Sequence, residues 1–405
     1  MPKREERVLI AGGGIGGLAA AIALGRRGIE TEILERSGFT EETGAGVQLG
    51  PNATLALAAL GVLEAVEPHA FRPEAIWVYD GISGRKLSSV PLGKHAEQHY
   101  GAPYLTLHRA DLQAGLRAAV QSLTPAGLRP GFEVTEIDTQ GGDVMAKASD
   151  GSEAKGVSLI GADGLWSTVR PLIMPEARLR FTGATAWRAL LPRESLPSPF
   201  DASVIGLWLG PGTHIVHYPV RGGRFLNVVA VSETGAERQG WNQPGGAETL
   251  LASFARWTKD SKSLLEQAEV WRSWSLSRLT PLSRWSAGRI ALLGDAAHPV
   301  LPYLAQGAAL AIEDAVTLAA CIEALRGDPA AAFRRYEALR RPRVARVQRL
   351  SRRFGWLYHL RGPLRLGRNL VLARRSEATA LRRFDWLYRA RPSPTSRGSL
   401  PRSTE

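Results

Sequence analysis

The chain has 405 residues, of which 44% are hydrophobic and 22% charged. This composition excludes collagen-like, coiled-coil and wholly disordered proteins, and the length predicts two or three globular domains. No apolar run approaches the ~20 residues of a transmembrane helix, and the charged N-terminus lacks the apolar core of a secretory signal. The single cysteine, Cys321, cannot form an internal disulfide. We therefore expect a cytoplasmic protein in which Cys321 serves as buried packing.

The net charge of +13 is concentrated at the C-terminus. From Arg341 to Glu405 there are 17 arginines, no lysine and 3 acidic residues, a net charge of +14 that leaves the preceding chain almost neutral. Such a segment could bind nucleic acid or an anionic membrane, or it could pack on the protein with a solvated basic face. Because Phe354, Trp356 and Leu357 interrupt the arginines, the pattern favours packing, and we expect no nucleic-acid partner and no membrane span.

The first elements form a βαβ pattern. A buried strand from Val8 to Ala11 leads through a glycine-rich turn into an alanine-rich helix from about residue 18 to residue 27. After Gly28, a second strand runs from Thr31 to Leu34 and ends at Glu35. This order predicts the start of a doubly wound α/β domain.

Strand patterns dominate the middle of the chain. A hairpin begins at Ile76–Tyr79, a helix resumes near His108, and a strand covers Val157–Ile160. Residues 182–276 predict an antiparallel sheet with strands at Ala184–Leu191, Ser203–Leu209, His214–Val220, Phe225–Val231 and Glu269–Leu276. A strand at Arg289–Leu293 and a long helix after Gly307 then return to the α/β pattern.

The predicted fold class is therefore α/β. We expect a Rossmann-like domain with a doubly wound parallel sheet, interleaved with an antiparallel β-sheet domain and followed by C-terminal helices. The Rossmann-like domain would comprise residues 1–75, 102–180 and 287–330, and the β domain residues 76–101 and 181–286. Residues 331–391 would form the helical region, and residues 392–405 a disordered tail.

Gly12, Gly14 and Gly17 stand in a Gly-x-Gly-x-x-Gly motif between the first strand and the first helix. The first glycine permits the tight turn, the second lets a pyrophosphate approach the backbone, and the third lets the helix pack on the strand. Backbone N–H groups and the positive end of the helix would hold the phosphates, and Glu35 would accept hydrogen bonds from ribose hydroxyls. The motif predicts a dinucleotide site without specifying the dinucleotide.

Two later segments complete a set of three motifs. An Asp-Gly segment spans Leu159–Arg170, and a Gly-Asp segment spans Ala291–Pro299 and continues to Ala309. Either alone could be a turn, but in this order they resemble the fingerprints of the single-component flavoprotein aromatic hydroxylases, the para-hydroxybenzoate-hydroxylase-like FAD monooxygenases. The resemblance covers about residues 7–340. Five segments are similar to the salicylate hydroxylase and 3-hydroxybenzoate 6-hydroxylase branch: Gly44–Asn52, His108–Leu112, Thr185–Arg188, Leu301–Gly307 and Phe384–Tyr388.

The resemblance implies a tightly bound FAD in the Rossmann-like domain and NADH or NADPH as a transient visitor. In this family Asp163 would be associated with both FAD and NAD(P)H, Asp295 with the ribityl chain, and Arg109 with the pyrophosphate region. The helix beginning at Gly307 would direct its N-terminus at flavin N1 and O2 and stabilise the anionic reduced flavin. The full set of implied cofactor residues is Gly12, Gly14, Gly17, Glu35, Arg36, Val47, Arg109, Asp163, Asp295, Gly307 and Ala308.

The candidates for substrate chemistry are Pro302, Gln306, His214 and Tyr218. Pro302 matches the proline that lies over the flavin in the family, and Gln306 stands just before the helix. On their shared strand, alternation puts His214 and Tyr218 on one face and His217 on the other. In 3-hydroxybenzoate-type relatives a histidine and a tyrosine at this spacing line the substrate pocket together with the glutamine. The resemblance therefore implies that His214 and Tyr218 bind a phenol oxygen and remove its proton. The alternative is an exposed strand histidine and a core tyrosine.

The implied reaction uses NAD(P)H and O2 to hydroxylate a small phenolic aromatic acid, salicylate or a hydroxybenzoate, through a flavin C4a-hydroperoxide kept away from water. The alternative on the same fold is an epoxidase or quinone-precursor hydroxylase acting on a larger apolar substrate. We expect a monomer or homodimer. No metal site is expected, because His95 and His99 lie in a polar, loop-like stretch, and we expect His298 to be structural beside Asp295.

Overall fold

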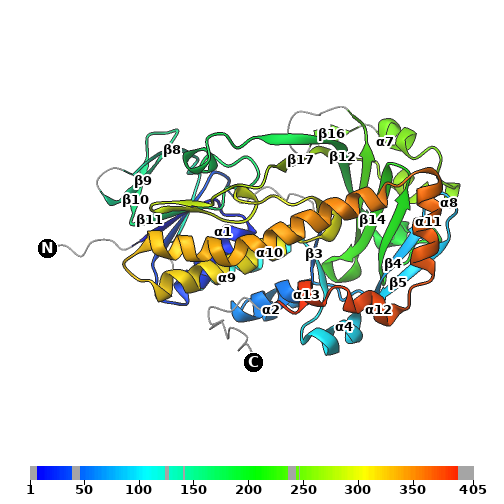
Figure 1. Ribbon diagram of the computed structural model, residues 1–405, viewed down its shortest axis with the longest axis horizontal. Helices are drawn as coiled ribbons and strands as arrows, with labels where there is room; N and C mark the ends of the chain where they lie inside the picture. Colours follow the sequence, from blue (N-terminus) through cyan, green and yellow to red (C-terminus); the bar gives the residue numbers. More distant parts are fainter. Residues whose placement is uncertain are drawn as a thin grey trace, which may run out of the picture.

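The computed structural model describes residues 7–38, 46–123, 127–139, 142–235, 243–245 and 247–390. Figure 1 shows an elongated molecule with its two main sheets arranged along the long axis and the long helix α10 (Pro329–Tyr358) running beside both. The sheet that contains the N-terminal strand lies at one end of the molecule, and the larger sheet lies at the other. The predicted tail, residues 392–405, falls outside the described residues.

The six-stranded sheet has the order β18-β19-β11-β1-β2-β7. Neighbouring strands are parallel except at the β18–β19 edge. Its strands are β1 (Val8–Ala11), β2 (Thr31–Glu35), β7 (Leu128–Pro130), β11 (Ser158–Gly161), β18 (Ser286–Ala287) and β19 (Ile290–Leu292). The alanine-rich helix α1 (Ile15–Gly25) packs against α5 (Arg109–Leu123) and α9 (Gly307–Ala324). The carboxyl ends of the parallel strands therefore meet at one edge, where doubly wound sheets bind their ligands.

The larger sheet has eight strands in the order β16-β17-β12-β15-β14-β13-β4-β5. They are β4 (Ala75–Asp80), β5 (Lys86–Pro91), β12 (Leu179–Pro192), β13 (Ile205–Gly210), β14 (Thr213–Val220), β15 (Phe225–Glu233), β16 (Gln243–Gly245) and β17 (Trp271–Leu279). The strands predicted within residues 182–276 pair antiparallel as expected, whereas β13 runs parallel to β4, which comes from the earlier hairpin. These two strands come from separate excursions of the chain, so no hairpin turn forces them to be antiparallel.

The predicted α/β fold with interleaved sheets and C-terminal helices is confirmed, while the exact domain limits stay a prediction. Two small sheets were not anticipated. One pairs β3 (Gly46–Leu49) with β6 (Leu105–His108), and the other joins β8 (Val134–Asp138), β9 (Val144–Ala148) and β10 (Glu153–Gly156).

Several shorter helices connect these strands. They are α2 (Pro51–Ala59), α3 (Leu63–Val66), α4 (Gly93–Tyr100), α6 (Arg170–Ile173), α7 (Ala247–Ser253) and α8 (Lys259–Lys262). The expected loop around His95 and His99 is wrong, since both lie on α4, and His99 Nε2 lies 2.9 Å from Asp385 Oδ1. Among the described residues, no three His, Cys, Asp or Glu side chains cluster in a way that could hold a metal ion.

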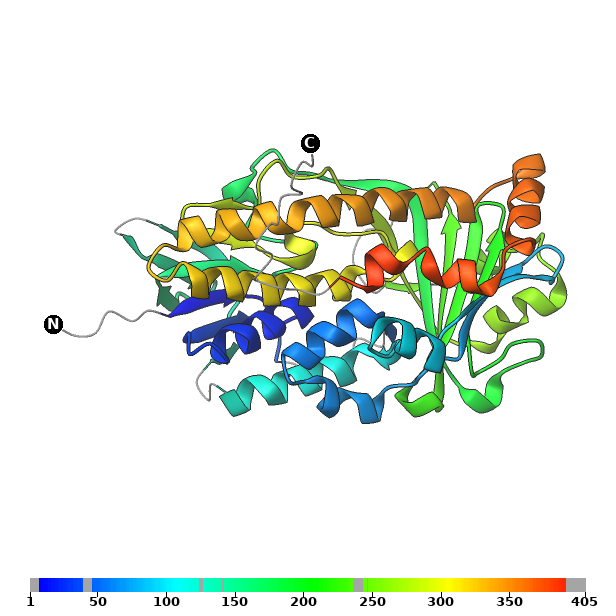
Figure 2. The ribbon, with the colours of Figure 1, turned by 60° about the horizontal axis from the view of Figure 1, so that its bottom comes forward.

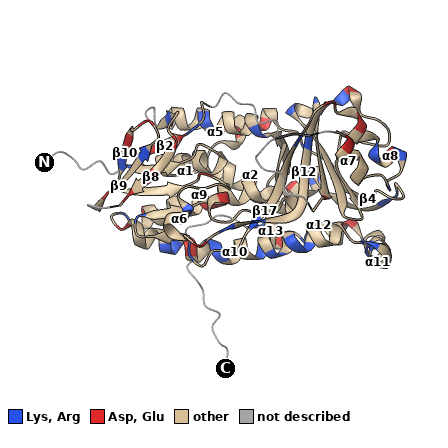
Figure 3. Ribbon diagram, turned by 90° about the horizontal axis from the view of Figure 1, so that it is seen from above, with Lys and Arg blue, Asp and Glu red and all other residues tan. Residues whose placement is uncertain are grey.

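The arginine-rich region packs on the rest of the protein. Beyond α10 follow α11 (Gly362–Ala373), α12 (Glu377–Arg382) and α13 (Asp385–Tyr388), which turn back along the molecule in Figure 2. Figure 3 shows basic residues along α10 and α11. Some of these are neutralised by acids of the larger sheet: Arg365 Nη1 donates to both carboxylate oxygens of the buried Asp80 at 2.7 and 2.8 Å. Within the described ranges, no helix has both the length and the apolarity to cross a membrane.

Candidate active site

A cavity of about 520 Å³ lies where the two main sheets meet. Its wall is formed by the carboxyl ends of β1, β2, β11 and β19, the N-termini of α1 and α9, and strands β12, β14, β15 and β17. Gly17 is the one predicted site residue that does not line it. The others do: Gly12, Gly14, Glu35, Arg36, Val47, Arg109, Asp163, His214, Tyr218, Asp295, Pro302, Gln306, Gly307 and Ala308.

The glycine motif brings β1, β11 and α1 close together. Gly12 has φ +104°, and a Cβ there would lie 2.5 Å from the carbonyl oxygen of Ala162. A Cβ on Gly17 would lie 1.9 Å from the Gly12 oxygen, so Gly17 permits packing of the helix on the strand. A Cβ on Gly14 would have no atom within 4 Å, and Gly14 faces the cavity. The N-terminus of α1 thus presents backbone N–H groups to an open space suited to phosphates.

The backbone fixes the Glu35 carboxylate at the end of β2. Its Oε2 accepts a hydrogen bond from the Gly13 N–H at 2.5 Å, and its Oε1 accepts one from the Ser37 N–H at 2.8 Å. Each carboxylate oxygen keeps further acceptor capacity toward the cavity. Glu35 is therefore oriented to accept hydrogen bonds from a ribose diol.

Asp163, at the end of β11, uses one of its two carboxylate oxygens for hydrogen bonds within the described part of the protein. Oδ2 accepts from the Thr168 N–H at 2.8 Å, from the Thr168 hydroxyl at 3.1 Å and from the Val169 N–H at 3.1 Å. Oδ1 is buried without a hydrogen-bond partner among the described residues. A buried acceptor without a partner at a cavity wall indicates a position for a ligand donor.

Arg109 and Asp295 bring opposite charges into the cavity. Both side chains are accessible from its interior, although protein atoms surround them. Burial lowers the pKa of Arg109, and the nearby Asp295 carboxylate opposes that shift. Burial likewise raises the pKa of Asp295, while His298 and Arg109 oppose the rise. Such groups can bind a pyrophosphate and a polyhydroxyl chain by charge-assisted hydrogen bonds.

The loop that leads into α9 is strained. Ala305 has φ +51°, in the left-handed region that alanine rarely adopts. The turn leads directly into the first residues of α9, and Gly307 and Ala308 line the cavity. The positive end of the helix dipole is thereby available to an anionic ring system. Pro302 lines the cavity from the start of the same loop.

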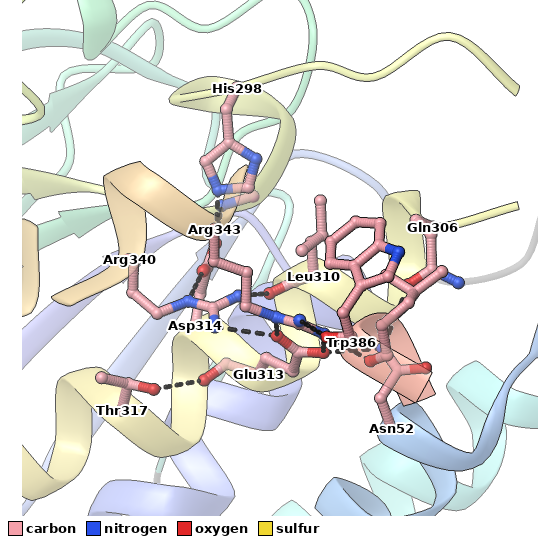
Figure 4. Close-up of polar contacts among 12 residues, drawn as sticks. Asn52, His298, Gln306, Leu310, Glu313, Asp314, Thr317, Arg340, Arg343 and Trp386 are labelled. Atoms are coloured by element: carbon pink, nitrogen blue, oxygen red, sulfur yellow. Dashed lines mark hydrogen bonds and ion pairs between the residues drawn. The ribbon is translucent and has the colours of Figure 1, made fainter. Parts of the chain in front are cut away.

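A buried polar network holds Gln306 from beneath (Figure 4). Asn52 Nδ2 donates to Gln306 Oε1 at 3.0 Å and to Glu313 Oε1 at 2.6 Å. Glu313 Oε2 in turn accepts from Arg340 at 2.8 Å and from Arg343 at 2.7 Å. Because its oxygen accepts from Asn52, the Gln306 amide nitrogen is left to donate toward the cavity.

His298 lies close enough to Asp295 to lower the pKa of that carboxyl, and its hydrogen bond goes to another acid, Asp314. His298 Nε2 lies 2.5 Å from Asp314 Oδ2, and Asp314 Oδ1 accepts from Arg340 Nε at 2.6 Å. Burial alone would raise the pKa of Asp314, but His298 and Arg340 lower it to about 2. The partner comes from α9, which follows His298 in the chain and folds back over it. Cys321 on α9 is buried, as predicted.

The other end of the cavity carries aromatic and imidazole groups from β14. His214 and Tyr218 both line it, whereas His217 lies on the opposite face with its ring centroid 5.2 Å from that of Phe200. Burial lowers the pKa of His214 well below its ordinary value, and the neighbouring His359 lowers it further. Burial raises the pKa of Tyr218. At neutral pH, therefore, His214 is an uncharged proton acceptor and Tyr218 an uncharged donor.

Arg188 on β12 is the main cavity residue that the sequence interpretation missed. Its guanidinium lies 4.4 Å from the ring centroid of Trp274, and its Nε is buried without a hydrogen-bond partner in the described part of the chain. Burial lowers its pKa to about 10, an effect that Tyr218 opposes and Arg109 increases. The Thr185–Arg188 segment resembles the family, but no local pattern indicates that the arginine faces the cavity.

Comparison with known proteins agrees with this geometry. Residues 5–351 match the family model described as FAD binding domain. The chain belongs to this FAD-binding family. The 3-hydroxybenzoate 6-hydroxylase 1 of Aquipseudomonas alcaligenes is 37% identical over 386 residues, which cover 95% of this chain and 98% of the relative.

Two solved structures are similar over almost the whole chain. Klebsiella pneumoniae HpxO complexed with FAD and uric acid has a TM-score of 0.81 and 27% identity, covering 93% of this chain and 95% of that one. A salicylate hydroxylase substrate complex has a TM-score of 0.81 and 25% identity, covering 96% and 97%. The expected hydroxylase family, its enzyme class and its FAD cofactor are thereby confirmed.

The cavity fits FAD on its own chemistry. It offers a glycine-lined helix N-terminus for phosphates, the backbone-fixed Glu35 for a ribose, and Asp163 Oδ1, which has no hydrogen-bond partner among the described residues. The helix dipole of α9 lies at the other side, where a flavin ring would carry negative charge when reduced. The role of each individual residue stays a prediction.

Proposed function

We propose that this protein uses FAD, a nicotinamide cofactor and O2 to hydroxylate the ring of a small phenolic carboxylic acid, with 3-hydroxybenzoate as the first candidate. One observation carries the proposal: a neutral buried histidine, His214, shares one cavity with Arg188, whose buried Nε has no hydrogen-bond partner among the described residues. His214 can accept a phenol proton, and Arg188 can bind a carboxylate. The relative named 3-hydroxybenzoate 6-hydroxylase supports the same substrate class.

When bound, FAD takes electrons from the nicotinamide cofactor and activates O2 for ring hydroxylation. The chain contributes binding and orientation. Gly14 and Glu35 would hold the ADP half, and Arg109 and Asp295 the pyrophosphate and ribityl chain. The N-terminus of α9 at Gly307 would stabilise negative charge on the ring system.

The substrate end prepares the aromatic ring and excludes water. Removal of the phenol proton by His214 would make the ring richer in electrons. An electron-rich ring is more easily attacked by an electrophilic oxygen. Tyr218 and the amide nitrogen of Gln306 would donate hydrogen bonds to the substrate. The apolar side chains of Val229 and Val231 complete the lining and limit the access of water.

The alternative, an epoxidase or quinone-precursor hydroxylase with a larger apolar substrate, fits this lining less well. Arg188, His214 and Tyr218 place three polar groups where such a substrate would require an apolar surface. The expected cytoplasmic location, the monomeric or homodimeric state and the choice between NADH and NADPH stay predictions.

The test measures NADH and NADPH oxidation by the FAD-loaded protein with 3-hydroxybenzoate, salicylate, 3-hydroxybenzamide and an apolar aromatic, while O2 uptake and H2O2 are followed. We expect fast oxidation, little H2O2 and a hydroxylated product with at least one phenolic acid. Oxidation that yields only H2O2 with every acid would contradict hydroxylation of this class. Turnover of the apolar aromatic alone would favour the alternative.

A further inference from the structure

We propose that His359 and Glu233 form a proton relay that carries the phenol proton from His214 to solvent. The inference rests on the proposed function, because it requires a phenol at His214. The path itself consists of side chains whose contacts the structure gives directly.

Hydrogen bonds join the cavity to the surface. His214 Nδ1 lies 2.9 Å from His359 Nε2, and His359 Nδ1 lies 3.1 Å from Glu233 Oε1. Glu233 Oε2 accepts from Arg361 Nη2 at 2.6 Å. His214 is 3% exposed and the His359 side chain 6%, but the Glu233 side chain is 44% exposed. The chain of contacts therefore runs from a buried cavity wall to a carboxylate in contact with water.

The carboxylate at the outer end determines which nitrogen of each ring carries a proton. Hydrogen bonding to His359 lowers the pKa of Glu233, so this carboxylate is ionised and can only accept. As a neutral imidazole, His359 then carries its proton on Nδ1, which leaves Nε2 to accept from the Nδ1–H of His214. His214 lines the cavity, and its Nε2 makes no hydrogen bond with the described residues; with the proton on Nδ1, Nε2 is unprotonated. This is the tautomer that a general base requires.

A relay is needed because protonated His214 is unfavourable, so the proton must move on to another group. Its buried site lowers its pKa well below the ordinary value, so a charged imidazolium there is disfavoured. Its other neighbours give no alternative acceptor: the rings of Tyr303 and Tyr358 each lie 5.5 Å from His214, centroid to centroid. Burial, together with Glu233, raises the pKa of Tyr303 to about 12, and burial also raises that of Tyr358. Both phenols stay protonated.

Backbone hydrogen bonds to Gly212 hold His359 and Glu233 in place. His359 caps the C-terminus of α10, and its carbonyl oxygen accepts from the Gly212 N–H at 3.1 Å, while the Glu233 N–H donates to the Gly212 oxygen at 3.0 Å. Gly212 has φ +68°, and a Cβ there would lie 2.6 Å from Arg361 Nη2. The turn between β13 and β14, the end of β15 and the end of α10 are thus held together around the two relay residues.

Each transfer breaks one bond to hydrogen and forms one. The phenol O–H breaks as His214 Nε2–H forms, the His214 Nδ1–H breaks as His359 Nε2–H forms, and the His359 Nδ1–H breaks as Glu233 Oε1–H forms. Glu233 then releases the proton to water. Neither imidazole ends with a charge. The reverse sequence, starting from a protonated Glu233, returns a proton to the product oxygen and restores the original tautomers.

The first test requires no substrate. ¹⁵N NMR of the FAD-loaded protein with labelled histidine, assigned with a His214→Asn variant, reports the protonated nitrogen of His214. We expect a proton on Nδ1 and none on Nε2. A resting protein with the proton of His214 on Nε2 would overturn the relay, whether or not the proposed substrate class is correct.

The second test follows the proton itself. The FAD-loaded protein is mixed with 3-hydroxybenzoate in weak buffer with a pH indicator, and absorbance reports phenolate formation. In His359→Gln and Glu233→Gln, which keep polar contacts but cannot pass a proton, we expect proton release and kcat to fall at least about tenfold, with substrate Kd unchanged. The matched control is Arg361→Gln, which removes the ion pair but leaves the relay, and it should stay within about twofold.

The outcomes separate the two proposals. Relay variants that release the proton at the wild-type rate overturn the relay, and so does an Arg361→Gln control that slows as much as they do, because the effect would then come from the lost ion pair. A wild-type protein that binds none of the phenolic acids contradicts the proposed function instead, and the NMR result then decides the relay by itself.

Discussion

The two ends of the cavity are built from different parts of the polypeptide. The FAD end is mainly backbone: a glycine turn, the ends of parallel strands and two helix N-termini, with Glu35 held by N–H groups. The aromatic end is made of side chains on β12, β14, β15 and β17, with His214 supported from the end of α10. Backbone geometry follows local rules, whereas side chains on distant strands meet only through tertiary packing. FAD binding at the first end should therefore be weakened by added atoms. Catalysis and substrate binding at the second end should be weakened by the removal of functional groups.

The largest effect is expected at the aromatic end, from His214→Asn. Loss of the general base should lower kcat with a phenolic acid by about 10²- to 10⁴-fold, while FAD content remains that of the wild type. Steady-state kinetics and the flavin absorbance measure both. His217→Asn is the control, because His217 lies on the same strand but faces away from the cavity. An equal loss of activity in the control would mean that damage to β14, and not lost base chemistry, causes the effect.

The next largest effect is expected on stability, from the buried ion pair between Asp314 and Arg340. Asp314→Asn leaves Arg340 buried with one carboxylate fewer and should lower the free energy of unfolding by about 3 kcal/mol at pH 7, measured by urea denaturation. The folded-state pKa of Asp314, about 2, lies below its ordinary 3.8, so its contribution is present above pH 4 and is lost as the pH falls toward 2. The stability difference between wild type and variant should therefore shrink below pH 4. A difference that grows on acidification would contradict the assignment.

At the FAD end, the addition of one methyl group should be enough to weaken FAD binding. In Gly14→Ala the new Cβ meets no protein atom, so folding should be unaffected, but it projects into the space proposed for the pyrophosphate. We expect FAD affinity to fall by about 10²-fold, as measured by titration of the apoprotein. Gly367→Ala adds an equally unhindered Cβ on α11, outside the cavity, and should bind FAD normally. Unchanged affinity in Gly14→Ala would place the phosphates elsewhere.

The smallest of these effects concerns substrate charge. Arg188→Met keeps the bulk over Trp274 but removes the cation, so the Kd for 3-hydroxybenzoate should rise about 10- to 30-fold. Binding of the neutral 3-hydroxybenzamide should change little, because it makes no ion pair. Titrations with both ligands give this comparison directly. Equal losses for the acid and the amide would show that Arg188 acts through packing.

Much of this molecule follows from short-range rules that the sequence displays. The βαβ order, the glycine motif and the strand ends carrying Glu35, Asp163 and Asp295 depend on neighbours in the chain. Strand alternation was sufficient to separate the face of His214 and Tyr218 from that of His217. These features are predictable because backbone geometry and side-chain period are set within a few residues.

Only the tertiary structure decided the remaining features. It made β13 parallel to β4, turned Arg188 into the cavity, gave His298 its partner Asp314, and placed His359 beside His214, 145 residues away in the chain. None of these contacts has a local signal, because they depend on which strands pair and where a helix ends after a long excursion of the chain. The sequence alone thus determined the glycine turn and strand ends of the cofactor end and the face that His214 and Tyr218 share on β14. Packing between distant segments determined which polar side chains surround the aromatic end of the cavity.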